Sequence, residues 1–106
     1  MNVDASVWEE VFRRDKGYCR YCGLDLLQNY STYSSATADH LVARSAGGGD
    51  EPTNLVLACP GCNQMLSRAG QFQTFDARKE LLVERWREHD HWYRPLLHAL
   101  RGEKNG

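Results

Sequence analysis

The sequence predicts a single α+β domain of 106 residues. Two β-compatible stretches, residues 37–43 and 54–58, lie between segments whose apolar residues recur at helical spacing. Four cysteines form two Cys-x-x-Cys pairs around these stretches. With 42% hydrophobic and 25% charged residues, the composition is that of a folded domain. A chain this short buries a small fraction of its surface, so a bound metal would add useful stability.

The first half of the chain predicts a helix, a loop and one strand. Residues 4–15 have helical periodicity, Asp4 or Ser6 is suited to cap the helix, and Gly17 ends it. Residues 24–36 are polar and rich in Ser, Thr and Tyr, so we expect a loop with little regular structure. The strand that follows leads into a glycine-rich connection, which indicates a hairpin with a long loop.

The second half predicts the partner strand and two helices. A short helix is expected from Asn63 to about Ala69, stopped by Gly70. A longer helix begins at Asp76, which we expect to cap it. Pro95 should kink this helix or open a new one, because proline has no backbone N–H to donate within a helix.

The four cysteines have the spacing of a metal site. Cys19 and Cys22 form one pair, and Cys59 and Cys62 form the other. Two residues between cysteines make a tight turn that directs both sulfurs at one ion, so two turns complete the tetrahedral shell of a structural Zn²⁺. The alternatives are four unrelated buried thiols or a redox pair. The pairs lie further apart than the roughly 15–20 residues of a zinc ribbon, so we expect the functional residues between them.

Composition also bears on location and partners. The first residues show no basic stretch followed by an apolar run, and no apolar run is long enough to span a membrane. We therefore expect a cytoplasmic protein with reduced thiols. The net charge of −1 argues against a protein with a uniformly basic surface, but it leaves room for a small phosphate site.

Polar residues gather at the predicted hairpin and at the helix after it. Asp39 and His40 lie towards the end of the first strand, Asn54 opens the second, and Asn63 directly follows the last cysteine. A carboxylate, an imidazole and two amides suit hydrolysis assisted by a hard cation such as Mg²⁺ or Mn²⁺. Neighbours on a strand point to opposite faces, so Asp39 and His40 are expected to have separate roles, one as ligand and one as base.

This arrangement resembles the HNH endonuclease family in its cysteine-containing form. The resemblance covers about residues 16–68 and is carried by the runs Cys19-Arg20-Tyr21-Cys22-Gly23, Asp39-His40-Leu41-Val42-Ala43-Arg44-Ser45-Ala46-Gly47-Gly48 and Asn54-Leu55-Val56-Leu57-Ala58-Cys59-Pro60-Gly61-Cys62-Asn63. It implies a ββα-metal core over about residues 16–70, with a structural four-cysteine zinc site and flanking N- and C-terminal helices. Residues 1–106 would then be one HNH nuclease domain with a C-terminal helical extension over about 76–101.

The resemblance also implies roles for individual residues. His40 would be the general base that takes a proton from the attacking water, and Asp39 and Asn63 would hold the catalytic Mg²⁺ or Mn²⁺. Asn54 would brace the long loop and orient the base. The reaction would be hydrolysis of DNA phosphodiesters, by nicking or double-strand cleavage, leaving a 5′ phosphate and a 3′ hydroxyl. Purely structural alternatives are a turn residue for Asn54 and a helix cap for Asn63.

Basic residues near the first cysteine pair and the hairpin are the candidates for contacts with DNA phosphates. These residues are Arg13, Arg14, Lys16, Arg20, Arg44 and Arg68. DNA is the expected partner, and a homodimer or a partner protein would supply specificity for which so short a chain has little room. Leu66 stands where the family often carries Lys, and Arg68 is the nearby substitute.

Two other functions stay open on the sequence alone. One is a zinc-stabilised module that binds nucleic acid without cleaving it, although such a module has no need of Asp39, His40 and Asn63 together. The other is a protein-interaction module that uses the C-terminal helix. We expect Trp86, Trp92 and Tyr93 of that helix to pack in the interior.

Overall fold

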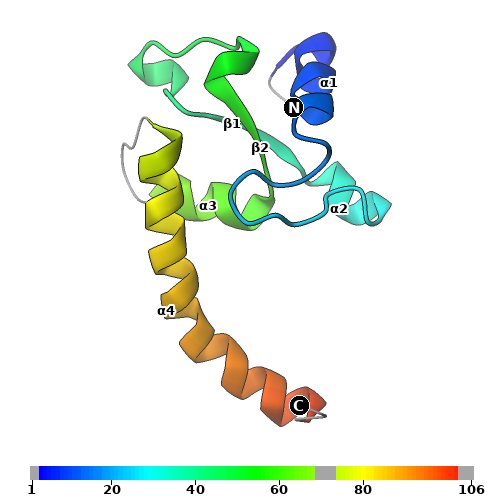
Figure 1. Ribbon diagram of the computed structural model, residues 1–106, viewed down its shortest axis with the longest axis vertical. Coiled ribbons are helices and arrows are strands. Elements are labelled where there is room, and N and C mark those ends of the chain that lie inside the picture. The colour runs from blue at the N-terminus through cyan, green and yellow to red at the C-terminus, as the bar shows by residue number, and fades with distance from the viewer. Residues whose placement is uncertain (1–2, 69–73, 103–106) are drawn as a thin grey trace.

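The computed structural model describes residues 3–68 and 74–102. Its helices and strands, in chain order, are α1 (Ala5–Arg14), α2 (Tyr30–Ser34), β1 (Thr37–His40), β2 (Leu55–Ala58), α3 (Pro60–Arg68) and α4 (Phe75–Arg101) (Figure 1). Two short 3₁₀ turns, η1 (Arg44–Ala46) and η2 (Pro52–Asn54), lie in the connection between the strands. Helices combined with one two-stranded sheet confirm the α+β class and are consistent with a ββα core.

The two strands form an antiparallel hairpin closed by a long connection. Thr37 lies opposite Ala58 and His40 lies opposite Leu55. Because side chains alternate along a strand, Thr37 and Asp39 share one face of β1, and His40 points to the other. The hairpin therefore separates the carboxylate from the imidazole, as the sequence predicts.

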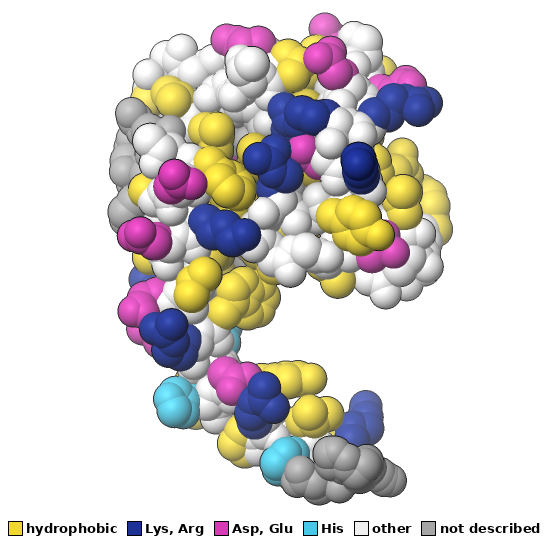
Figure 2. All heavy atoms as spheres, viewed as in Figure 1, with side chains coloured by type: hydrophobic (Ala, Val, Ile, Leu, Met, Phe, Trp, Pro, Cys, Tyr) yellow, Lys and Arg dark blue, Asp and Glu magenta, His cyan; other side chains and the backbone are white. Residues whose placement is uncertain are grey.

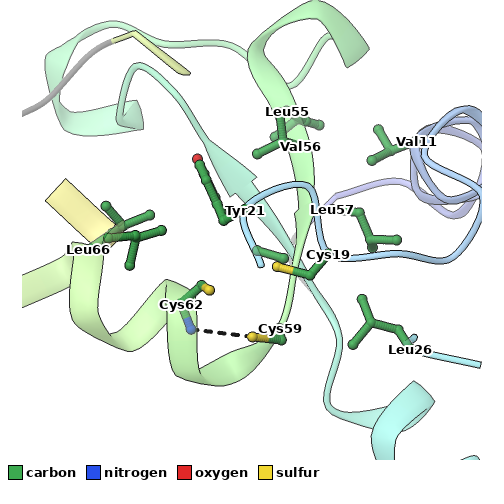
Figure 3. Close-up of a cluster of buried hydrophobic side chains, with 12 residues drawn as sticks. Val11, Cys19, Tyr21, Leu26, Leu55, Val56, Leu57, Cys59, Cys62 and Leu66 are labelled. Carbon is green, nitrogen blue, oxygen red and sulfur yellow. Dashed lines mark hydrogen bonds between the residues drawn. The ribbon is translucent and has the colours of Figure 1, made fainter. Parts of the chain in front are cut away.

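Strand β2 lies at the centre of the hydrophobic core. All four of its side chains are buried, with Leu55, Leu57 and Ala58 fully inaccessible. A strand covered on both faces appears in sequence as a continuous apolar run, which is the pattern of Leu55–Ala58. In Figure 3, Val11 of α1 and Leu26 lie on one side of β2, and Leu66 of α3 lies on the other.

A short helix, α2, occupies part of the segment in which the sequence predicts only a loop. The Asn29 side chain caps it, because its Oδ1 accepts the backbone N–H of Thr32 at 2.8 Å. Tyr33 of α2 also packs edge-on against Phe12 of α1, with ring centroids 5.5 Å apart. A cap and a tertiary contact thus stabilise a helix too short to be recognised by periodicity.

Helix α4 departs from prediction at its start. Thr74 caps it through an N–H···Oγ1 hydrogen bond from Ala77 of 3.2 Å, so Asp76 is not the cap but a first-turn acid. The helix continues past Pro95 to Arg101, so of the two predicted effects of Pro95 the opening of a new helix does not occur. Because proline lacks an N–H, the carbonyl one turn earlier loses its helical donor, and the solvent around this part of α4 can take its place.

The distal half of α4 extends away from the remainder of the molecule (Figure 1). Trp86, Trp92 and Tyr93 are 40%, 76% and 56% exposed, so the prediction that they pack in the interior is wrong. Apolar residues recur at the same helical spacing whether or not another element covers them, and on the distal half of α4 hydrophobic side chains lie at the surface (Figure 2). Among residues 3–68 and 74–102, no helix combines the length and apolarity that a membrane span requires.

Candidate functional site

The two cysteine pairs come together in one cluster. The Sγ atoms of Cys19, Cys22, Cys59 and Cys62 all lie within 4.8 Å of one another, and those of Cys22 and Cys59 are 3.7 Å apart. Four sulfurs about 2.3 Å from a tetrahedral Zn²⁺ would be separated by about 3.8 Å. The four cysteines are therefore positioned to bind a metal, and an all-thiolate set fits zinc.

Each cysteine pair is set by the local backbone. In the first turn, Gly23 adopts a positive φ of 80° and its N–H donates to the Cys19 carbonyl at 2.9 Å. The second pair spans the end of β2 and the start of α3, where the N–H of Cys62 donates to Cys59 Sγ (Figure 3). Hydrogen bonds from Cys59 and Cys62 lower the pKa of the Cys19 thiol, whereas burial raises the pKa of Cys22 and the hydrogen bond with Cys19 raises the pKa of Cys62.

His40 is paired with an acid that the sequence analysis missed. Its Nε2 lies 2.7 Å from Oδ1 of Asp50, which also accepts two hydrogen bonds from Arg44. The hydrogen bond from Arg44 and, to a smaller extent, the one with His40 lower the pKa of Asp50 to about 2. This carboxylate is therefore ionised and can only accept hydrogen bonds. His40 Nε2 therefore carries the proton, which leaves Nδ1 of the neutral ring as a proton acceptor.

Asn54 holds the two ends of the inter-strand connection together. Its Oδ1 accepts the N–H of Val42 at 2.9 Å, and its Nδ2 donates to the carbonyls of Val42 and Gly49 at 3.0 and 2.8 Å. A Cβ at Gly48 would collide with the Val42 carbonyl, so the glycine-rich segment is closely packed against the loop rather than merely flexible. These contacts place Asp50 beside His40.

Asp39 lies in a buried network on the opposite face of β1. Only 6% exposed, it accepts hydrogen bonds from the Tyr21 hydroxyl at 2.7 Å and from Arg78 Nη2 at 2.7 and 2.9 Å. Burial is the main cause that raises the pKa of Tyr21 well above its usual value, and the negative charge of Asp39 is the second. The phenol therefore stays protonated and donates a hydrogen bond. Burial disfavours the charge of Arg78, but Asp39 outweighs it and the pKa of Arg78 is raised.

Asn63 lies in α3, facing the same side of β1 as Asp39. Its Nδ2 donates to Thr37 Oγ1 at 2.9 Å, two residues along the strand from Asp39. Asn63 is half-buried, and none of the described residues donates a hydrogen bond to its Oδ1. An amide oxygen and a carboxylate oxygen are ligands suited to Mg²⁺ or Mn²⁺. The donor set fits such a cation, although Asp39 already holds Arg78.

Comparison with known protein families gives one match, which covers the hairpin and both cysteine pairs. The family model described as HNH endonuclease matches residues 19–69. The similarity to the HNH endonuclease family therefore covers 51 of the 106 residues. The matched range, here called the HNH segment, includes all four cysteines and Asp39, His40, Asn54 and Asn63. The family indicates a nuclease or another nucleic-acid function. No curated protein matches the chain with significance.

Two of the predicted phosphate-binding arginines, Arg14 and Arg20, bind an acid beside the HNH segment. Both donate to Asp15 Oδ1, at 2.8 and 3.0 Å, and Asp15 Oδ2 accepts the backbone N–H of Leu57 at 2.9 Å. Burial opposes ionisation of Asp15, but these hydrogen bonds outweigh it and lower its pKa. Arg20 also lies over the Phe75 ring, 4.9 Å from its centroid. Their charges therefore serve the packing of α1 and β2.

The remaining candidates for phosphate contacts are Arg13, Lys16, Arg44 and Arg68. Arg13 is exposed and pairs with Glu9 at 2.8 Å, and Lys16 is exposed in the turn after α1. Arg44, inside the HNH segment, is held by Asp50. The side chain of Arg68, at the end of α3, lies outside the part of the chain that the structure describes.

Three partners of the predicted site residues were not found from sequence. Asp50 pairs with His40, while Tyr21 and Arg78 hold Asp39. Asp50 carried a usable signal, since it ends the glycine-rich connection next to the predicted base. Arg78 carried none, because it lies in α4 and its distance from Asp39 along the chain is 39 residues.

Proposed function

We propose that this protein is a metal-dependent DNA endonuclease in which His40 activates water and Asp39 and Asn63 hold a divalent cation. The observation that carries the proposal is the His40–Asp50 hydrogen bond of 2.7 Å within the HNH segment. A histidine held by an ionised carboxylate is the arrangement of a general base. The imidazole is partly exposed, with 17% of its side chain accessible, so water can reach it.

The proton transfer follows from the geometry of this pair. Nε2–H donates to Asp50, so Nδ1 takes the proton from the attacking water. The imidazolium that forms remains beside the Asp50 carboxylate, whose negative charge stabilises it. Asn54 keeps the loop closed around Asp50, which fixes the orientation of the ring. A divalent cation on Asp39 and Asn63 would offset the negative charge that develops on the phosphate and on the leaving oxygen.

DNA phosphates would be met by the exposed basic residues, and those without a shared buried acid are the most available. Lys16 and Arg13 lie at the end of α1, and Arg44 lies on the loop that carries Asp50. Arg14 and Arg20 share one partner, Asp15, so this trio keeps one net positive charge that could also face a phosphate. So few contacts imply a modest, salt-sensitive affinity with little reading of bases. A homodimer or a partner protein remains our proposal for the source of specificity.

The cysteine cluster would give this site its rigidity. A Zn²⁺ on the four thiolates joins the first turn to the junction of β2 and α3, and so fixes Asn63, which follows Cys62 directly. With four protein ligands the ion has no open position for substrate, so its role is structural.

Cleavage of supercoiled plasmid tests the proposed function. Zinc-loaded wild-type protein should nick or linearise the plasmid with Mg²⁺ or Mn²⁺ and be inactive without an added divalent cation. His40→Ala should lose about 10²–10⁴-fold in rate, the usual share of a general base. His91→Ala, an exposed histidine on the distal part of α4, is the matched control and should keep the wild-type rate. Cleavage by His40→Ala at the wild-type rate would refute the assignment.

A nucleic-acid-binding module without cleavage is the second candidate, and one observation favours it. Arg78 neutralises the carboxylate that the cation would need. Retention of plasmid DNA in a mobility-shift assay, with no cutting by wild-type protein under either cation, would support this candidate instead of the nuclease.

A further inference from the structure

Arg78 connects the C-terminal helix to the carboxylate of the proposed cation site. It lies in the first turn of α4 and is 8% exposed. Its Nη2 donates to both oxygens of Asp39, and its Nε donates to the Tyr21 hydroxyl at 3.0 Å, which in turn donates to Asp39. Three side chains from three separate segments, the first cysteine turn, β1 and α4, thus close a buried ring.

The Asp39 carboxylate has little capacity left for another ligand. Its two oxygens offer about four lone-pair positions, and one Tyr21 and two Arg78 contacts occupy three of them. A divalent cation at the remaining position would stand beside a guanidinium of the same sign. In a buried site such repulsion is weakly screened.

We infer that Arg78 and a divalent cation compete for Asp39, so that loading of the cation displaces the Arg78 guanidinium. The inference rests on the proposed function, because it concerns the same cation site, and it adds a control that α4 exerts on that site. Reciprocity of linked equilibria requires that the cation weaken the Arg78 contact as much as Arg78 weakens cation binding. Helix α4 is also anchored by buried Leu82 and by the stacking of Phe75 on the Tyr21 ring, and these two contacts do not involve the Arg78 guanidinium.

Mn²⁺ binding to zinc-loaded protein, followed by the electron paramagnetic resonance signal of free Mn²⁺, tests the competition. Arg78→Gln should bind Mn²⁺ roughly 5–150-fold more tightly than wild type, the usual range of coupling between sites. Lys79→Gln removes the same charge from the same turn at an exposed position and should bind like wild type. Adding Asp39→Asn to Arg78→Gln should abolish the gain.

Each outcome separates the competition from the proposed function. Equal or weaker Mn²⁺ binding by Arg78→Gln overturns the competition and leaves the nuclease proposal intact. Absence of Mn²⁺ binding by both wild type and Arg78→Gln overturns both. A gain that survives the added Asp39→Asn change places the ion elsewhere and also overturns the competition.

A measurement on the wild-type protein covers the case in which Arg78→Gln does not fold, since that variant leaves Asp39 as a buried unpaired charge. Saturating Mg²⁺ should accelerate solvent exchange of the Arg78 Nε–H, observed by ¹⁵N nuclear magnetic resonance, because the guanidinium leaves its buried partners. Exchange that is unchanged in Mg²⁺-bound protein overturns the competition.

Discussion

Replacing Asp50 with Asn removes the negative charge that faces His40 while keeping a side chain of nearly the same size. Asp50 can only accept a hydrogen bond, and this fixes the proton of His40 on Nε2. The amide of Asn can instead donate to Nε2 from its own nitrogen. The ring then carries its proton on Nδ1, the atom that should receive the proton of water, and the base is lost in that tautomer.

The size of the effect follows from how Asp50 is placed. A general base contributes about 10²–10⁴-fold in total, which sets the upper limit for losing its orienting partner. Asp50 is 42% exposed and shares its charge with Arg44, so solvent and the guanidinium both screen it. We therefore expect Asp50→Asn to retain the base partially and to lose about ten- to a hundredfold in rate.

The assay is the initial rate of plasmid nicking at saturating Mg²⁺, with the fold checked by circular dichroism. Glu51→Gln is the matched control, because Glu51 is an exposed acid next in the chain whose side chain makes no hydrogen bond or ion pair with the described residues. It should keep the wild-type rate. Nicking by Asp50→Asn at the wild-type rate, or an equal loss in Glu51→Gln, would refute the orienting role of Asp50.

Two further predictions concern the frame around the site. Removing zinc with a chelator should abolish the cooperative thermal unfolding transition, because zinc binding to a four-cysteine site contributes roughly 10–16 kcal/mol to folding. Metal analysis should confirm that the treated protein is free of zinc. Unchanged melting of that zinc-free protein would contradict a structural zinc. Asn54→Ala should lower the free energy of unfolding by about 2–4 kcal/mol, since three hydrogen bonds of about 0.5–1.5 kcal/mol each are lost and backbone groups stay unpaired. Nicking should fall with it, whereas Asn29→Ala, which removes the cap of α2, should leave the nicking rate unchanged.

The sequence predicted the features that depend on short spacing. Cys-x-x-Cys pairs must form turns with convergent sulfurs, and an apolar run such as Leu55–Ala58 indicates a covered strand whatever packs on it. Side chains alternate between the two faces of a strand, and this rule likewise predicts that Asp39 and His40 point to opposite faces of β1. Each of these rules applies within one segment, so it does not depend on how the segments pack against one another.

Side-chain pairing across the fold was not predictable in the same way. An arginine in a sequence shows the sign of its charge but not its partner, so the contacts of Arg14 and Arg20 with Asp15 could not be predicted. The exposure of Trp86 was missed for a related reason. A stripe of apolar residues shows which face of α4 is apolar, and only the length of the core decides whether anything covers it.

The acids near the site share one property that bears on substrate binding. Asp15, Asp39 and Asp50 each hold at least one arginine, and these ion pairs remove positive charge from the region where a phosphate would bind. A chain with net charge −1 thus has little attraction for DNA beyond its few exposed basic side chains. In the proposed reaction, positive charge at the phosphate would therefore come mainly from the cation. Cation loading that releases Arg78 from Asp39 would, on the same proposal, free one further positive charge next to the cation site.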